Sequence, residues 1–156
     1  MSEVSRVGVR ACRASEIFSD AASADLIAEY ERECANPLLG ACAPQQAIYA
    51  ALEERGFARC FAAYRGNELC GFAFVLTAAV PHYEGKFARV ESLFVASAAR
   101  GSNLGRELME ALEGSCREAG CAAVCYSAPA GSRLARLLSL SSDYMNTNLL
   151  FCRSLK

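Results

Sequence analysis

The amino-acid sequence predicts one domain of the α/β (α+β) class, in which helices cover both faces of a mixed, twisted sheet. Three observations support this prediction. The chain has 156 residues, a usual length for a single domain over residues 1–156. Strand and helix patterns follow one another in the order β-α-α-β-β-β-α-β-α-β. A strand–helix–strand run at 87–128 implies parallel neighbours, whereas the hairpin before it implies antiparallel ones.

The first third of the chain indicates one strand and two helices. Residues 4–12 alternate apolar and polar side chains, which is typical of a strand. Residues 23–36 follow with a helical pattern, in which Ser23 is placed to cap the first turn. A second helix is predicted from Pro44 to Arg55, before the glycine at position 56.

The remaining elements are expected from the same patterns. Strands are predicted at 57–64, 69–80, 87–98, 121–128 and 146–155, and the first two are joined by a tight turn at 65–68. The strand at 121–128 is almost wholly apolar, which predicts burial on both of its faces. Helices are predicted from Leu104 to Gly120 and over 132–140.

Charge and hydropathy exclude several classes of function. The chain has 16 basic and 17 acidic side chains, and it has no run of five like charges, so we expect no nucleic-acid partner. No stretch of about 18 apolar residues is free of charges, so we expect no membrane span. The opening segment MSEVSRVGVRACRASE has no apolar core of signal-peptide length, which favours a cytoplasmic protein.

The nine cysteines lie in apolar contexts. An odd number argues against a closed set of disulfides, and no C-x-x-C pair occurs, so we expect no metal site. Cys121 and Cys125 would share one face of a strand but lie about 13 Å apart at the usual rise. We therefore expect core packing for most of the cysteines.

The segment ARGSNLGRELMEAL at 99–112 places glycines and arginines where a helix begins. The first N–H groups of a helix are unpaired and carry partial positive charge, so they bind phosphate well when the backbone is accessible. Gly101 and Gly105 permit a close approach, and Arg100 and Arg106 add full charges. A P-loop is excluded because no Lys-Ser or Lys-Thr follows, and the spacing does not fit a dinucleotide-binding turn. A plain loop before a helix remains the alternative.

The longer stretch VESLFVASAARGSNLGRELMEALEGSCREAG resembles the cofactor motif of the GNAT acetyltransferase superfamily. That motif is a strand ending in hydrophobic-x-Val, a short link, and Arg/Gln-x-x-Gly-x-Gly/Ala at a helix start. The element order is similar to the family's acyl-CoA N-acyltransferase fold over nearly the whole chain. Asn103 departs from the pattern because it replaces the middle glycine.

The resemblance implies acetyl-CoA as the cofactor. By this correspondence the backbone of Leu93, Phe94 and Val95 would run beside the pantetheine and the acetyl group. The N–H groups of the glycine turn would hold the pyrophosphate; the turn comprises Arg100, Gly101, Ser102, Asn103, Leu104, Gly105 and Arg106. The N–H of Val95 would also donate to the oxyanion that forms during acetyl transfer.

The proton acceptor is expected to be Glu91. It lies in an apolar strand, and a period of two places it on the same face as Leu93 and Val95. A surface glutamate paired with Arg89 is the alternative. His82 in the connection at 81–86 is a second candidate base, against a surface loop histidine.

The general acid is less clearly indicated. The family often uses a tyrosine, but its expected position in this chain is Ser139. Tyr144 is the first substitute, with a structural role as its alternative, and Tyr126 is a second one that would otherwise pack in the core. The thiolate could also leave without assistance.

The resemblance thus implies an acetyl-CoA-dependent N-acetyltransferase that acts on a primary amine of a small molecule or a peptide. A non-catalytic module that binds acyl-CoA on the same fold is the alternative, kept open by Ser139 and Asn103. A homodimer is compatible with the resemblance, because many relatives dimerise.

Overall fold

Five strands form one sheet in the order β1-β2-β3-β4-β5. The computed structural model describes residues 7–19 and 21–155. The strands are β1 (Val7–Cys12), β2 (Ala58–Arg65), β3 (Glu68–Ala79), β4 (Lys86–Val95) and β5 (Cys121–Tyr126). The helices are α1 (Ala14–Phe18), α2 (Ala24–Cys34), α3 (Gln46–Glu54), α4 (Leu104–Glu118) and α5 (Arg133–Leu140). Short 3-10 turns cover Ala21–Ser23 and Ser97–Ala99.

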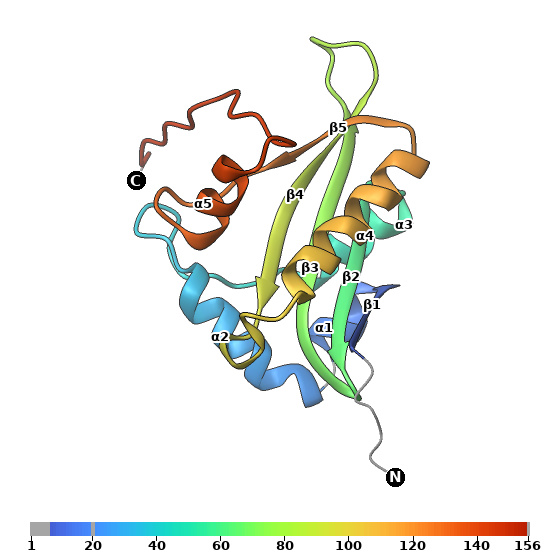
Figure 1. Ribbon diagram of the computed structural model, residues 1–156, viewed down its shortest axis with the longest axis vertical. Coiled ribbons are helices and arrows are strands. Elements are labelled where there is room, and N and C mark those ends of the chain that lie inside the picture. Colours follow the sequence, from blue (N-terminus) through green and yellow to red (C-terminus); the bar gives the residue numbers. More distant parts are fainter. Residues whose placement is uncertain (1–6, 20, 156) are drawn as a thin grey trace.

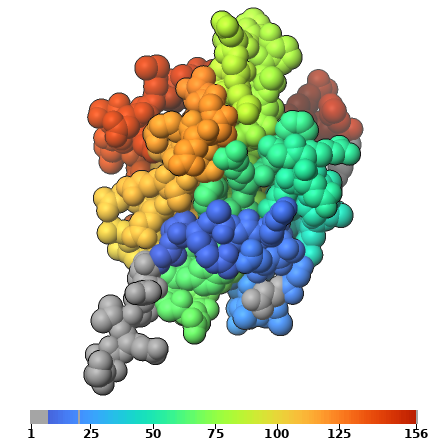
Figure 2. Space-filling view, turned by 90° about the vertical axis from the view of Figure 1, so that its right-hand side faces the viewer, coloured from blue at the N-terminus to red at the C-terminus, as the bar shows by residue number. Residues whose placement is uncertain are grey.

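The sheet is mixed, as the sequence predicts. Strands β1 to β4 pair antiparallel, and β4 pairs parallel with β5 through the crossover helix α4. Figure 1 shows α4 in front of the strands and α3 behind them. Figure 2 looks onto the β1 edge, with α4 on one side of the sheet and α3 on the other. The prediction of helices on both faces of a mixed sheet is therefore confirmed.

Two hydrophobic cores fill the spaces between the layers. One lies between the sheet and α4, where Leu104, Leu108 and Leu112 are fully buried. The other lies between the sheet and the helices α1, α2 and α3, and it is largely aromatic. Its rings are those of Tyr30, Tyr49, Phe72, Phe74 and Phe94. Because neighbouring residues of β2 and β3 alternate between these cores, the central strands are buried on both faces.

Several predicted elements differ from the structure. Residues 4–6 of the first predicted strand lie outside the described residues, and α1 was not predicted. Ser23 precedes α2, but its side chain makes no capping hydrogen bond. Strand β4 ends at Val95 rather than at residue 98, because a 3-10 turn begins at Ser97.

The C-terminal predictions were wrong in two respects. Residues 146–155 form no strand and do not extend the described five-stranded sheet. Strand β5 is therefore an edge, and Ala122, Ala123 and Cys125 are exposed, so it is not buried on both faces. The exposed apolar residues of this region are Leu137, Leu140, Met145, Leu149, Leu150, Phe151 and Leu155.

Most of the nine cysteines pack in or against a core, as expected. Cys60, Cys70 and Cys116 are buried in the cores, Cys12, Cys42 and Cys121 are partly buried against them, and Cys34, Cys125 and Cys152 are exposed. Cys12 and Cys60 face each other across β1 and β2 with their Sγ atoms 3.3 Å apart. The described residues contain no cluster of three or more His, Cys, Asp or Glu side chains able to hold a metal. No helix in the described ranges has the length and apolarity to cross a membrane.

Candidate functional site

A β-bulge at Glu91 organises the site. Phe74 of β3 pairs with Ser92, and Val75 pairs with Val90, so Glu91 has no partner on β3. An extra residue of this kind bends the strand and changes the direction of the following side chains. Val90 packs in the α4 core before the bulge, and Phe94 packs in the aromatic core after it.

The bulge also turns Glu91 toward the helices α2 and α3. Its Oε2 atom accepts a hydrogen bond of 2.9 Å from the Tyr49 hydroxyl of α3. Leu93 and Val95 pack on the opposite face, against the α4 core. The prediction that Glu91 shares a face with Leu93 and Val95 was therefore wrong, because the period of two does not hold across a bulge.

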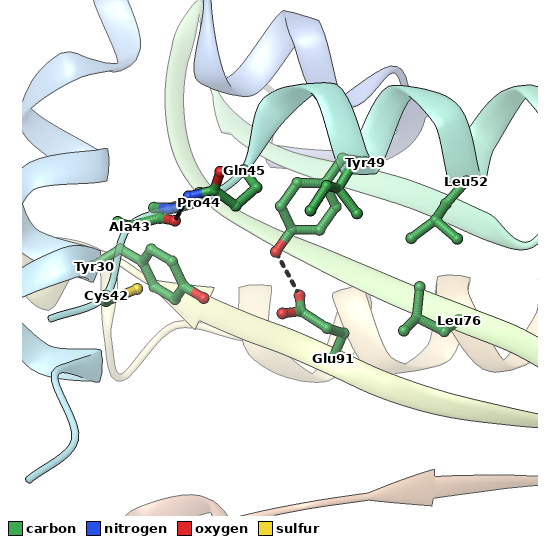
Figure 3. Close-up of a pocket in the computed structure, with 10 residues that line it drawn as sticks. Tyr30, Cys42, Ala43, Pro44, Gln45, Tyr49, Leu52, Leu76 and Glu91 are labelled. Carbon is green, nitrogen blue, oxygen red and sulfur yellow. Dashed lines mark hydrogen bonds between the residues drawn. The ribbon is translucent and has the colours of Figure 1, made fainter. Parts of the chain in front are cut away.

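A cavity of about 390 Å³ opens beside Glu91, and we call it the acceptor cavity. Figure 3 shows the hydroxyls of Tyr30 and Tyr49 turned toward the Glu91 carboxylate from α2 and α3. The cavity is lined by Tyr30, Cys42, Ala43, Pro44, Gln45, Ile48, Tyr49, Leu52, Leu76 and Glu91. One carboxylate with two phenols thus lies in an otherwise mostly apolar space.

Both phenols remain protonated at neutral pH. Burial raises the pKa of the Tyr30 hydroxyl, and the negative charge of Glu91 raises it further. The pKa of Tyr49 is raised by the same two causes and by its hydrogen bond to Glu91. The Tyr49 hydroxyl therefore donates to this carboxylate, whereas the Tyr30 hydroxyl is hydrogen-bonded to the Cys42 thiol. No salt bridge links Glu91 to Arg89 among the described residues.

The parallel pairing of β4 with β5 stops at the bulge. The last pair is Val90 with Tyr126, so the later part of β4 has no neighbour on this side. The Ala96 N–H donates to the Cys70 carbonyl oxygen of β3 at 2.9 Å. Because successive peptide groups point to opposite sides of a strand, the N–H groups of Leu93 and Val95 point away from β3. They form a free edge that can pair with an extended ligand.

The glycine turn between β4 and α4 has an accessible backbone. Gly101 has φ +87°, a conformation that side chains rarely adopt, and a Cβ there would meet nothing within 4 Å. At Gly105 a Cβ would meet only the Val95 Cγ2 at 3.9 Å. The first N–H groups of α4 at Gly105 and Arg106 have no acceptor among the described residues. The turn therefore fits a diphosphate, since its own packing leaves the approach open.

Asn103 fits this turn without strain. Its φ and ψ are −78° and −3°, which is ordinary helical backbone. Its carbonyl oxygen accepts the Glu107 N–H at 2.9 Å, as the cap of α4. The glycine that the family pattern has here is not required by the backbone of this chain.

Arg100 fastens the turn to α2. Its guanidinium forms an ion pair with Glu33 at 2.7 Å, and its Nε donates to the Val95 carbonyl oxygen at 2.9 Å. Glu29 of the same helix accepts the Ser97 N–H at 2.8 Å. The Arg100 side chain is thus engaged by carboxylates, whereas Arg106 forms only an exposed pair with Glu110 at 3.6 Å.

Tyr144 and Tyr126 share one carboxylate of α4. Their hydroxyls donate to Oε1 of Glu113 at 2.8 Å and 2.6 Å, and their rings are 5.6 Å apart. Burial raises the pKa of Tyr144 to about 12, with a further contribution from the hydrogen bond to Glu113. These phenols lie on the α4 side of the sheet, opposite to the side that Glu91 faces.

His82 lies apart from the other candidates. It is in the connection between β3 and β4, where its ring contacts Tyr83 at 4.8 Å. Lys86 and Glu91 are five residue steps apart on β4, which is about 16 Å along a strand. The structure therefore does not bring His82 to the acceptor cavity, and Tyr49 is the Glu91 partner that sequence analysis missed. Its position on the apolar face of α3 gave no signal other than that of a core residue.

The sequence matches the family model described as the acetyltransferase (GNAT) family over residues 21–137. A search of curated proteins gave no match. Solved structures resemble this fold along almost the whole chain. One is an aminoglycoside acetyltransferase from an uncultured soil metagenomic sample in complex with sisomicin. It has 18% identity and a TM-score of 0.72, and the alignment covers 96% of this chain and 97% of that one.

Two further solved structures also resemble this fold. The ribosomal-protein-alanine N-acetyltransferase from Brucella melitensis biovar Abortus 2308 has 18% identity and a TM-score of 0.63, with 94% of this chain and 100% of that chain covered. The aminoglycoside N-acetyltransferase AAC(6')-Iy in complex with CoA has 14% identity and a TM-score of 0.67, with 100% and 99% covered. At these identities the likeness establishes the fold.

Proposed function

Because the chain belongs to the acetyltransferase (GNAT) family, we propose that it transfers the acetyl group of acetyl-CoA to a primary amine. The observation that carries this proposal is the bulge at Glu91. It places a carboxylate in the acceptor cavity at the point where the free edge of β4 begins. A proton acceptor and a cofactor strand therefore meet at one residue.

The cofactor would lie along β4 and the glycine turn. The free N–H groups of Leu93 and Val95 suit the amide groups of pantetheine, and the Phe94 backbone lies between them. The backbone of the turn suits the pyrophosphate, with Arg106 as a further positive charge. The turn comprises Arg100, Gly101, Ser102, Asn103, Leu104, Gly105 and Arg106. When bound, acetyl-CoA supplies an activated acetyl thioester.

The residues of the chain would handle the protons. Glu91 accepts a proton from the acceptor ammonium, directly or through water, while Tyr49 holds the carboxylate in place. The Val95 N–H donates to the acetyl oxygen as negative charge develops on it. In the balanced reaction a C–N bond forms, the C–S bond breaks, and the CoA sulfur gains a proton. Tyr144 is the proposed donor of that proton, and His82 is assigned no step.

Thiol release and cofactor binding test this proposal. Purified protein is incubated with acetyl-CoA and a panel of amines, and CoA is measured by mass, because nine protein cysteines would react with a thiol reagent. We expect CoA and an acetylated amine in equal amounts. Acetyl-CoA binding without product on a broad panel, peptides included, would instead indicate a non-catalytic acyl-CoA-binding module.

A matched pair of variants locates the cofactor. Gly101→Glu adds a side chain and a negative charge to the turn, so we expect the affinity for acetyl-CoA to fall by at least about 100-fold. Gly120→Glu makes the same change at φ +76° in equally open space, at the other end of α4. Calorimetry on both variants separates the loss of a phosphate site from the cost of backbone strain. Equal affinities would show that the phosphate binds elsewhere.

The proposal also concerns assembly and location. We propose one catalytic domain over 1–156 that works in the cytoplasm, supported by nine free thiols, which suit a reducing compartment. The exposed apolar side chains of α5 and of residues 145–155 support a homodimer, because a second copy would cover them. Light scattering after size-exclusion chromatography tests the dimer, and a monomer at all concentrations would refute it.

A further inference from the structure

We propose that the acceptor is a small monoamine whose single ammonium group is attached to an apolar alkyl or aryl body. This inference rests on the proposed function and names the substrate class of the acceptor cavity. It also assigns the choice of substrate to Ile48, at the apolar side of that cavity.

The charge of the acceptor cavity indicates how many ammonium groups it can pair with. Among the described residues that line it, Glu91 is the only charged one. Glu91 is itself exposed, so its carboxylate remains in contact with water. One carboxylate can neutralise one ammonium, and a second ammonium would lie against the apolar lining, where it loses hydration and gains no partner among the described lining residues.

The neighbouring carboxylates do not line the cavity, although Glu31 of α2 is close enough to Cys42 to add to the effect of burial and raise the pKa of that thiol. Glu29 and Glu33 of α2 are engaged by the Ser97 N–H and by Arg100. Glu53 of α3 accepts the Ala14 N–H at 2.9 Å. Recruiting any of these groups to a polycationic acceptor would break a contact that fixes the turn or α1. The cavity therefore offers a single strong site for positive charge.

The other lining residues indicate that the rest of the acceptor molecule is apolar. Leu52, Leu76 and Pro44 provide aliphatic surface, and Ile48 is 58% exposed although it lies on the cavity side of α3. An apolar ligand would remove that isoleucine from water, at about 25 cal/mol per Å² of apolar surface. The hydroxyls of Tyr30 and Tyr49 are turned toward the carboxylate, where their oxygens can accept hydrogen bonds from an ammonium group.

The volume of the cavity suits a small ligand. About 390 Å³ lies at the lower end of the ~300–1,000 Å³ range of small-molecule sites. A compact amine of one ring or one short alkyl chain fits such a space.

The first test compares acceptors on the intact protein. The probes are 2-phenylethylamine and hexylamine as monoamines, 1,5-diaminopentane and sisomicin as polyamines, and a peptide with a free N-terminus. We expect kcat/KM for the two monoamines to exceed that of each other probe by at least about tenfold. A higher kcat/KM for sisomicin, the diamine or the peptide would overturn the inference while the proposed function stands.

The second test changes the cavity itself. Ile48→Glu adds a second carboxylate to the apolar side, so kcat/KM for 2-phenylethylamine should fall by about tenfold while that for 1,5-diaminopentane rises. Val80→Glu is the matched control, because Val80 is 37% exposed just after β3 and does not line the cavity. An unchanged diamine-to-monoamine ratio in Ile48→Glu would refute the assigned role of Ile48.

Measuring cofactor binding distinguishes a wrong substrate class from a wrong proposed function. Calorimetry with acetyl-CoA is run on each protein before the kinetics. If acetyl-CoA binds and only polycations are acetylated, the substrate class is wrong and the proposed function is retained. If acetyl-CoA does not bind, the proposed function fails and this inference fails with it.

Discussion

The Tyr49 hydroxyl donates a 2.9 Å hydrogen bond to Oε2 of Glu91, which joins α3 to the bulge of β4. The partners are 42 residues apart in the chain, and the aromatic core fixes the Tyr49 ring against Phe74 at 4.5 Å. A carboxylate held in one orientation loses less freedom when it accepts a proton. This contact therefore links the packing of α3 to the chemistry that we propose at β4.

Tyr49→Phe should lower kcat by about tenfold, because a hydrogen bond to a charged group contributes roughly 1.5–3 kcal/mol. The KM for acetyl-CoA should not change, since Tyr49 does not border the glycine turn. Steady-state kinetics measure both parameters. Tyr83→Phe is the control, because Tyr83 is 62% exposed in the connection between β3 and β4. An unaltered kcat in Tyr49→Phe would remove Tyr49 from the positioning of Glu91.

Gly71→Ala should displace β4 and weaken acetyl-CoA binding. A Cβ at position 71 would lie 2.6 Å from the Phe94 carbonyl oxygen, a distance that forces the backbone to move. We expect a lower melting temperature together with reduced cofactor affinity, measured by calorimetry. Gly114→Ala in α4 has open space and should instead stabilise the helix by up to about 1 kcal/mol. Normal cofactor affinity in Gly71→Ala would show that the register of β4 does not position the ligand.

Glu29→Gln should reduce stability at neutral pH more than at acid pH. The Ser97 N–H lowers the pKa of Glu29 below its usual value of 4.5. Because the pKa of Glu29 is lower in the folded state than in the unfolded state, the ionised carboxylate stabilises the fold at pH values above the unfolded-state pKa. This contribution is lost as the pH falls through the folded-state pKa. The difference in melting temperature between wild type and variant should therefore be constant from pH 7 to 5 and shrink below 4.5. Glu54→Gln, an exposed change on α3, is the control, and a difference that grows with acid would contradict the assignment.

Glu113→Gln should lower the pKa of Tyr144. Burial and the Glu113 carboxylate keep this phenol protonated, with a pKa of about 12 against the usual 10. Because the pKa of Tyr144 is higher in the folded state than in the unfolded state, the protonated phenol stabilises the fold below pH 10. This contribution to the free energy of unfolding is lost as the pH rises toward 12. Phenolate absorbance during alkaline titration measures the change. A Tyr144→Phe protein identifies the Tyr144 signal, and identical curves for wild type and Glu113→Gln would refute the coupling.

Much of the fold follows from local patterns. Alternation and helical spacing predicted the central strands, α4 and the parallel crossover, because each element buries one face in a fixed period. The strand predicted at 146–155 failed for a non-local reason. A strand requires a neighbour for its N–H and C=O groups, and no apolar pattern shows whether one is present.

The candidate site also contains features that local sequence predicts and features that depend on distant packing. The sequence by itself determined the glycine turn, since Gly101 and the first N–H groups of α4 are local features of a helix start. Only the tertiary structure decided the direction of Glu91. A bulge depends on the register between β3 and β4, and this register brings Glu91 to Tyr49 instead of to the face of Leu93. The acceptor cavity likewise exists only because α2 and α3 pack across that bulge, and distant packing of this kind leaves no periodic mark on the chain.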